Sequence, residues 1–501
     1  MNNIQDIFVF ITEASFPFIA RIFVTFLTIK HFGFIRGIIL TYLILKLYTL
    51  LITKIFKVEK LTGIDKTFLD KNFHKRYQIV SLMSFSNFNA EKISNFILET
   101  HINKLHRFRL KLTKIFFEYW WTEVDAAEAK NKMKIYPRIK TEKELMEYVS
   151  KELNTPLDVM HELPYEFHII PFGEEKDNKG YILFKYDHLL TDGLGLVSTI
   201  CSCATNYDIN NFPSIMRNMK EDKWYETIIN WIFYPYYTIY YSLWFLLQRP
   251  RVSAFKPTKP YGKTLIAKST KEYSLKAFEG FRKGKVMSFN DLMVLVFSLA
   301  SKKLIKQVET CKHKDKMRFM IPHGRKELPK DLEHVDLDNK ANGLFVEIPL
   351  IDEITDRNIK IIKSSIRRNF KKPIQFAYLQ SLYILGEYFS WPIQSFCAQM
   401  ISDNYEIAFS NVPGPTVQLN YNGAICDSMV SFPTSGRGFS FLPLVSYNGN
   451  FQMALSMDES CPIKPEMFIR YIEDELDLIL IDIQNGKYST NNEQSSNKKN
   501  V

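Results

Sequence analysis

One short segment of the chain combines residue types that can do acid–base chemistry. It reads Tyr186-Asp187-His188-Leu189-Leu190-Thr191-Asp192-Gly193. A histidine side chain titrates close to neutral pH, so His188 can act as a general base. Asp192 can fix the loop or pair with a cation, and Gly193 permits a tight turn. The alternative is a histidine that Asp192 satisfies in a turn without chemistry, and three fixed positions do not decide between the two.

The residues around this segment predict the elements that position it. An alternating run at Tyr181–Tyr186 predicts a strand that delivers the chain to His188, and a helix can begin at Leu194. Elsewhere, strand patterns alternate with helical periodicity, which indicates an α/β protein without internal repeats. Further strands are predicted at Phe345–Pro349 and Ile407–Phe409, a hairpin at Val445–Leu455 with Asn448-Gly449 in its turn, and helices at Ile93–Leu105 and Pro465–Ile483.

The chain lacks other common catalytic motifs. Gly193-Leu194-Gly195 lacks the third glycine of a dinucleotide loop, and the chain has no GxSxG, GxxxxGK or HExxH pattern. The six cysteines are scattered without CxxC pairs, which indicates packing residues in a reducing compartment. No metal site is therefore predicted.

Length and composition limit the class of protein. The chain has 501 residues, of which 46% are hydrophobic and 24% charged, so two or three domains with real cores are expected. A slightly negative mean hydropathy excludes a polytopic transporter. The net charge of +11 leaves nucleic acid, a membrane or an anionic substrate open. Basic runs without interleaved aromatic residues argue against nucleic acid.

The first sixty residues concentrate positive charge within apolar sequence. Ala14 to Val58 contains no Asp or Glu, but six Lys or Arg residues among two apolar runs, Phe16–Ile29 and Phe34–Phe56. This pattern predicts membrane insertion or interfacial docking, with a buried core helix as the alternative. Lys46 in the middle of the second run opposes a simple span. Trp224–Gln248 is rich in aromatic residues and fits either a membrane-interface belt or a pair of core helices, with a kink at Pro235.

Several motifs in a fixed order resemble the wax ester synthase/diacylglycerol acyltransferase family. Its HHxxxDG pattern is matched from the second position onward, because Asp187 stands in place of the first histidine. The other matching segments run in order from about Leu61 to Leu480: Pro156-Leu157-Asp158, Leu163-Pro164-Tyr165-Glu166, Ser288-Phe289-Asn290-Asp291, Ile321-Pro322-His323-Gly324-Arg325, Asn342-Gly343 to Pro349, Ser410-Asn411-Val412-Pro413-Gly414-Pro415, Ser446-Tyr447-Asn448-Gly449 and Asp458.

The resemblance implies an architecture and an activity. It implies two chloramphenicol-acetyltransferase-like α/β halves with mixed sheets and a tunnel between them, which the acceptor and acyl-CoA enter from opposite sides. A long-chain acyl group would pass from acyl-CoA to a lipid hydroxyl, either of diacylglycerol or of a fatty alcohol. Acyl-CoA is a co-substrate here, and no cofactor is expected. The expected location is the cytoplasmic side of a membrane, that of the endoplasmic reticulum.

The family pattern also implies roles for particular residues. His188 and Asp192 are the catalytic candidates, with His188 as the base and Asp192 orienting the loop. Gly193 would make room for the substrate or the backbone, and Asn290 would shape the site near the oxyanion, or alternatively cap a helix. Asn411 and Gly414 would shape the tunnel wall or a crossover between the halves. Asp187 raises the alternative of a catalytically lapsed member that serves as a lipid-binding or membrane-complex subunit.

The predicted division of the chain follows from these observations. It comprises a membrane-associated anchor (1–60), an N-terminal acyltransferase half (61–215), an aromatic segment with a linker (216–265), a C-terminal acyltransferase half (266–486) and a disordered tail (487–501).

Overall fold

The computed structural model describes residues 16–70, 77–212, 223–247, 253–259, 262–308, 315–324, 326, 328–370 and 372–487. The predicted tail after Lys487, Arg325, and parts of the predicted linker lie outside these residues.

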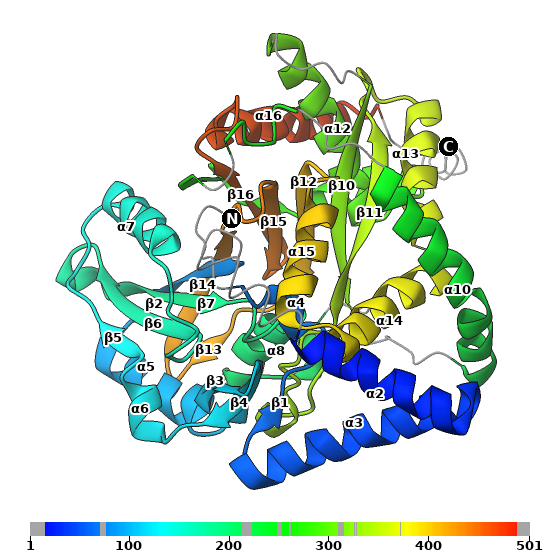
Figure 1. Cartoon of the computed structure of the whole chain (residues 1–501). Coiled ribbons are helices and arrows are strands. Elements are labelled where there is room, and N and C mark those ends of the chain that lie inside the picture. Colours follow the sequence, from blue (N-terminus) through cyan, green and yellow to red (C-terminus); the bar gives the residue numbers. More distant parts are fainter. Residues whose placement is uncertain are drawn as a thin grey trace.

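The N-terminal half is built on a six-stranded sheet with the strand order β13-β14-β2-β7-β6-β5 (Figure 1). Its pairs are antiparallel except β5 with β6. The strands are β2 (Gln78–Ser86), β5 (Met133–Ile135), β6 (Tyr165–Phe172), β7 (Lys179–Asp187), β13 (Asn420–Tyr421) and β14 (Ala424–Pro433), and the helices are α5 (Ala90–Ile97), α6 (Ala126–Lys130), α7 (Glu142–Asn154) and α8 (Gly193–Cys203). The helix predicted at Ile93–Leu105 is shorter, because α5 passes into a π-helical turn at Leu98–Ile102.

The C-terminal half is built on a seven-stranded mixed sheet. Its order is β11-β10-β12-β15-β16-β8, with β9 also paired to β16. β12 runs parallel to both β10 and β15. Its strands are β8 (Thr264–Lys268), β9 (Tyr273–Ser274), β10 (Lys316–Gly324), β11 (Ala341–Pro349), β12 (Ile407–Pro413), β15 (Ser440–Tyr447) and β16 (Asn450–Asp458). The predicted hairpin turn is confirmed, because Asn448 and Gly449 both have positive φ angles, 48° and 79°.

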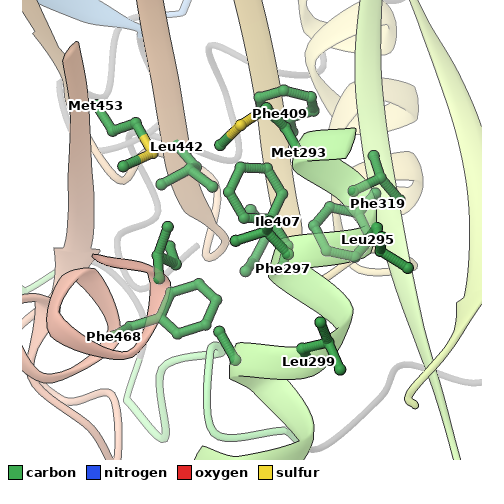
Figure 2. Packing of buried hydrophobic residues seen from close by; sticks show 14 of the residues in the cluster. Met293, Leu295, Phe297, Leu299, Phe319, Ile407, Phe409, Leu442, Met453 and Phe468 are labelled. Carbon is green, nitrogen blue, oxygen red and sulfur yellow. The ribbon is translucent and has the colours of Figure 1, made fainter. Parts of the chain in front are cut away.

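The largest hydrophobic core lies between this sheet and two helices, α12 (Phe289–Gln307) and α16 (Pro465–Gln484). In Figure 2, Phe297 of α12 lies against Phe409 of β12, with 4.8 Å between ring centroids, and Leu295, Leu299 and Phe468 belong to the same cluster. A Ser288–Asp291 capping box starts α12, and Pro465 occupies the first turn of α16, as predicted. The remaining helices of this half are α11 (Glu279–Gly284), α13 (Asp356–Asn369), α14 (Lys372–Tyr388) and α15 (Trp391–Ser402).

One segment crosses between the halves. β13 and β14 come from the C-terminal part of the chain, but β14 pairs with β2 along its length and so belongs to the N-terminal sheet. The predicted boundary of the C-terminal half, 266–486, is corrected accordingly: residues 420–433 lie in the other half. Because the chain leaves β12, crosses, and returns at β15, the two halves are tied together beside the predicted site.

Three apolar helices lie at the edge of this body (Figure 1): α2 (Phe16–Phe32) and α3 (Phe34–Phe56) pack as a hairpin, and α10 (Trp224–Leu247) packs on α14. Most of α3 is exposed, so the alternative of a buried core helix is wrong. The aromatic segment is one helix that continues through Pro235 with an exposed outer side, so the core-pair alternative is also wrong. Among the described helices, α3 is the one long and apolar enough to cross a membrane.

A small antiparallel sheet joins the hairpin to the body. It consists of β1 (Glu59–Lys60), β4 (Glu118–Glu123) and β3 (Leu110–Ile115), and the short helix α4 (Asp65–Phe68) follows β1. Short 3₁₀ helices complete the described elements at His106–Arg109, Glu175–Asp177, Ile209–Asn211, Lys276–Phe278 and Leu332–His334.

Candidate active site

His188 follows the last residue of β7, where the chain leaves the N-terminal sheet. Its backbone N–H donates to the carbonyl oxygen of Tyr77 at 2.9 Å, which continues the β2–β7 pairing by one residue. Its ring stacks on Phe68 of α4, with 4.0 Å between ring centroids. The strand therefore sets the position of the backbone, while α4 sets the plane of the imidazole.

A buried asparagine fixes the tautomer of His188. Asn339 Nδ2 donates to Asp65 Oδ1 at 2.8 Å and to the carbonyl oxygen of His188 at 2.9 Å. Both partners only accept hydrogen bonds, so the other amide atom, Asn339 Oδ1, faces His188 Nδ1 at 3.2 Å. That oxygen can only accept, so Nδ1 carries the proton. In the neutral imidazole, Nε2 is therefore the free base.

Two further buried groups hold this asparagine and the loop. Arg107 Nη2 donates to Asp65 Oδ2 at 3.0 Å and to the carbonyl oxygen of Leu189 at 3.0 Å. Its guanidinium also lies over the ring of Trp121, with Cζ 4.2 Å from the ring centroid. Because Asp65 is fully buried, its charge requires such a partner. The sequence analysis missed Asn339, Asp65 and Arg107.

Burial lowers the pKa of His188 below its ordinary value. The carboxylate of Asp192 and the hydrogen bond that His188 donates to Asn339 act in the opposite direction, while the positive charge of Lys326 also lowers the pKa. The imidazole is therefore neutral at pH 7, which is the state that a general base needs.

Asp192 fixes the loop and joins the two halves. Its Oδ1 accepts from the backbone N–H of Gly195 at 2.9 Å, which makes Asp192 the N-cap of α8. The same oxygen lies 3.0 Å from Lys326 Nζ, and Oδ2 accepts from the backbone N–H of Lys340 at 2.8 Å. Both lysines belong to the C-terminal half. In this geometry, Asp192 is a positioning residue.

Two cavities adjoin at His188. The larger, of about 280 Å³, is lined mainly by aromatic and aliphatic side chains from α4, α10, α14, α15 and the C-terminal sheet. The smaller, of about 100 Å³, lies between β2, α8, β12 and β14. His188, Pro322, Ala341 and Phe441 line both cavities. The structure therefore places a histidine between two cavities at the junction of the halves, and a continuous tunnel stays a prediction.

The other predicted site residues are two glycines at close contacts and two asparagines that bond to each other. Gly193 lines the smaller cavity, and a Cβ added there would lie 3.2 Å from Val412 of β12. Gly414 starts the crossover, where an added Cβ would lie 2.3 Å from the carbonyl oxygen of Ser446. Asn411 Nδ2 donates to Asn290 Oδ1 at 2.7 Å, which ties β12 to the start of α12. Neither asparagine is among the residues that line the two cavities.

The helix-cap alternative for Asn290 is wrong, because the N-cap of α12 is Ser288. Asp187, which replaces the first histidine of the family pattern, is buried and acts within the loop. Its Oδ1 accepts from the backbone N–H of Leu189 at 3.0 Å. Asp187 therefore helps to shape the turn that presents His188.

The residues that sequence reasoning missed are far apart in the chain. Asp65, Arg107, Asn339 and Lys326 lie in four separate segments without a local motif. A cluster of Glu152, Glu166 and His168 has ligand atoms within 4.8 Å of one another, but Lys185 Nζ lies 3.1 Å from Glu152 Oε2 and Lys134 Nζ lies 3.3 Å from Glu166 Oε1. These carboxylates are thus already paired with ammonium groups.

Known proteins resemble this chain in fold, and a family model matches part of its sequence. Residues 337–480 match the family model described as the WS/DGAT C-terminal domain. The wax ester synthase/diacylglycerol acyltransferase from Marinobacter aquaeolei VT8 has a similar structure, with 15% identity, a TM-score of 0.56, and coverage of 85% of this chain and 99% of that chain. Comparison with curated protein sequences found no match.

Two further solved structures share the fold. The TRI3 trichothecene 15-O-acetyltransferase from Fusarium sporotrichioides has 13% identity and a TM-score of 0.58, over 84% of this chain and 95% of that one. The epimerization domain from the third module of tyrocidine synthetase B has 15% identity and a TM-score of 0.52, over 86% and 98%. The fold is therefore that of the chloramphenicol-acetyltransferase-like proteins, as predicted. Within this class, the match over residues 337–480 confirms the resemblance to the wax ester synthase/diacylglycerol acyltransferase family.

Proposed function

We propose that this protein is an O-acyltransferase that moves a long-chain acyl group from acyl-CoA to a lipid hydroxyl, with His188 as general base. The observation that carries the proposal is the position of His188 between two cavities, with Nδ1 held by Asn339 and Nε2 left as the free base. The family match over residues 337–480 and the acyltransferase fold support this class of reaction.

The proposed reaction is a direct transfer. The acceptor hydroxyl loses its proton to His188 Nε2 as its oxygen attacks the thioester carbonyl carbon. When the tetrahedral intermediate collapses, the carbon–sulfur bond breaks and the imidazolium returns the proton to the CoA thiolate. The lowered pKa of His188 favours this return, because the imidazolium is then a stronger acid.

The linings of the cavities favour apolar substrates. The larger cavity presents Phe345, Ile401 and Phe441 among its apolar side chains, with the aromatic residues Tyr237 and Tyr241 on its α10 wall. Such a surface suits a lipid acceptor, either diacylglycerol or a fatty alcohol. Because both acceptors dissolve in membranes, we place the protein on a membrane, with the cytoplasmic side of the endoplasmic reticulum as the family-based expectation.

The test supplies the full-length protein with radiolabelled long-chain acyl-CoA and either diacylglycerol or a fatty alcohol in lipid vesicles. Labelled triacylglycerol or wax ester is the expected product, and its identity assigns the acceptor. If neither product forms with any chain length of acyl-CoA, the proposal fails. The alternative, a catalytically lapsed protein that serves as a lipid-binding or membrane-complex subunit, then takes its place.

A further inference from the structure

The outer sides of α2, α3 and α10 carry a dense set of exposed apolar side chains, which we call the apolar face. It includes Ile22, Phe23 and Phe26 on α2, Ile35, Ile39, Leu43 and Leu47 on α3, and Ile228, Ile232, Tyr236, Ile239 and Leu243 on α10. Figure 1 shows the hairpin along one edge of the body and α10 along the adjoining edge. Exposed apolar area of this extent marks a binding surface.

The packing between α2 and α3 indicates whether the apolar face contacts water or lipid. Where the two helices touch, the buried residues are small or hydroxylated: the hydroxyl groups of Thr28 and Thr41 lie 2.7 Å apart. A Cβ added to Gly37 would lie 2.5 Å from Ile29 Cα, so the backbones are in close contact. The hairpin thus holds two hydroxyl groups and a close glycine contact inside, while most of its exposed large side chains are apolar. That arrangement is typical of helices whose solvent is lipid.

The charges of the hairpin fit the surface of a membrane. Lys30, Arg36, Lys46 and Lys54 are exposed, and there is no acidic residue from Ala14 to Val58. Cytoplasmic leaflets carry anionic lipids, which attract basic side chains close to the headgroups. A second protein copy fits less well, because it would bring the same positive charges together.

The length of the hairpin limits its depth in the bilayer. Its open end contacts the body, because Arg21 pairs with Glu118, Phe18 stacks on Phe389 with 5.0 Å between ring centroids, and Leu45 lines a small cavity together with Trp120. From Leu45 to the turn at Gly33, α3 extends about 18 Å at 1.5 Å per residue. A hydrocarbon core is about 30 Å thick, so the hairpin beyond the body is too short to cross it.

The third helix of the apolar face is also a wall of the larger cavity. Tyr237, Thr238 and Tyr241 of α10 line this cavity, while Ile232 and Ile239 point outward with 67% and 60% of their surface exposed. α10 packs on α14 through aromatic contacts, with 5.1 Å between the ring centroids of Trp231 and Phe376 and 5.0 Å between those of Tyr241 and Tyr378. One helix layer therefore separates the cavity from the apolar face.

We propose that the apolar face lies in a single leaflet of a bilayer without spanning it, and that the lipid acceptor enters the larger cavity from that leaflet past α10 and α14. The proposal rests on the proposed function for the identity of the entering molecule. The single-leaflet docking itself stands on the geometry of the three helices.

The route is tested with the double variant Ile232→Glu/Ile239→Glu on the outer side of α10. Its matched control is Leu478→Glu/Ile481→Glu on α16, where both side chains are also exposed, at 51% each. Acyl transfer is measured with the acceptor in phosphatidylcholine vesicles containing phosphatidylserine, and with the same acceptor in detergent micelles. We expect the activity of the α10 variant in vesicles to be about tenfold lower than that of the unmodified protein, while its activity in micelles is unchanged.

The outcomes separate the route from the function. Equal losses in vesicles and micelles, or unchanged activity in vesicles, would overturn the proposed route. If the unmodified protein transfers no acyl group in either system, the proposed function fails, and flotation of the α10 variant with the same vesicles still tests the docking. Reduced flotation relative to the α16 control supports the docking, and equal flotation overturns it.

Single-leaflet docking is tested by the accessibility of the hairpin tip. Lys30→Cys is introduced together with Cys311→Ser into the full-length protein, which is then bound to sealed vesicles. A membrane-impermeant maleimide added outside is expected to label residue 30, with the Cys311→Ser parent as background. Labelling only by reagent trapped inside the vesicles would show a spanning hairpin and overturn the proposal.

Discussion

The loop around His188 and the apolar face differ in the kinds of side chain that they bury and expose. At the loop, charged and amide side chains are buried, and Asp65, Arg107 and Asn339 are hydrogen-bonded to one another or to the backbone. On the apolar face, aliphatic and aromatic side chains are exposed, while Thr28 and Thr41 are hidden within the hairpin. Both regions depart from the ordinary arrangement of a soluble protein, which buries apolar groups and exposes charges.

The difference shows how each departure is stabilised. A buried polar group costs free energy unless it is hydrogen-bonded, so the loop is stable only as a connected network. An exposed apolar face costs free energy in water but not in hydrocarbon, so the proposed contact with lipid would remove that cost. Substitutions in the two regions should therefore fail in different ways: the first in chemistry and folding, the second in membrane contact.

The largest effect is expected at His188. Replacing the proposed general base, His188→Ala, should lower kcat for acyl transfer by about 10²–10⁴-fold while the protein remains folded. The matched control is His161→Ala, because His161 is exposed and contacts only Asp158 among the described hydrogen bonds. Activity of His188→Ala equal to that of the control would contradict the proposed mechanism.

A large effect on folding is expected at the ion pair between the halves. Asp192→Asn keeps an N-cap for α8 but leaves the buried ammonium group of Lys326 without its partner carboxylate. Loss of one partner of a buried pair should lower the free energy of unfolding by about 3–5 kcal/mol, measured by urea denaturation. The exposed N-cap variant Asp331→Asn serves as control and should change it by less than about 1 kcal/mol.

A smaller effect on rate, with a change in pH dependence, is expected at Asn339. Asn339→Ala should lower kcat by about tenfold, because the imidazole loses its orienting partner. The hydrogen bond that His188 donates to Asn339 raises the pKa of His188, so without it that pKa falls further. The loss of activity on acidification should then occur at lower pH than in the unmodified protein.

The control for this profile is Asn358→Ala on α13, which should leave both the rate and the pH profile unchanged. A rate loss without any shift of the acid limb would indicate that Asn339 acts on folding of the loop and not on the imidazole.

The smallest effect is expected on the apolar face. Ile39→Ser on α3 should change the free energy of unfolding in solution by no more than about 0.5 kcal/mol, because the side chain is already exposed. Leu295→Ala within α12, where the side chain is fully buried, should lower it by about 2–5 kcal/mol. Similar losses in urea denaturation for both variants would show that the apolar face is packed against protein in solution.

Much of the fold could be predicted from local pattern. The strand before His188, the helix after Asp192, the Asn448-Gly449 turn and the helix at Pro465 all follow from periodicity and turn chemistry, which act over a few residues. The crossover of β13 and β14 could not be predicted, because strand pairing between β14 and β2 joins residues more than 300 positions apart. The same holds for Asn339, whose partners His188 and Asp65 are distant in sequence.

By itself, the sequence determined the motif, the amphipathic elements and the concentration of basic apolar residues near the N-terminus. These features depend on residue type and short spacing, which fix backbone preference and charge. The tertiary structure alone decided which nitrogen of His188 is free, which groups hold it, and which apolar helices remain exposed. α3 and α12 are both apolar helices, but only packing buries α12 against the sheet and leaves α3 on the outside. Burial and hydrogen-bond partners depend on distant segments meeting, and those contacts are set by the whole fold.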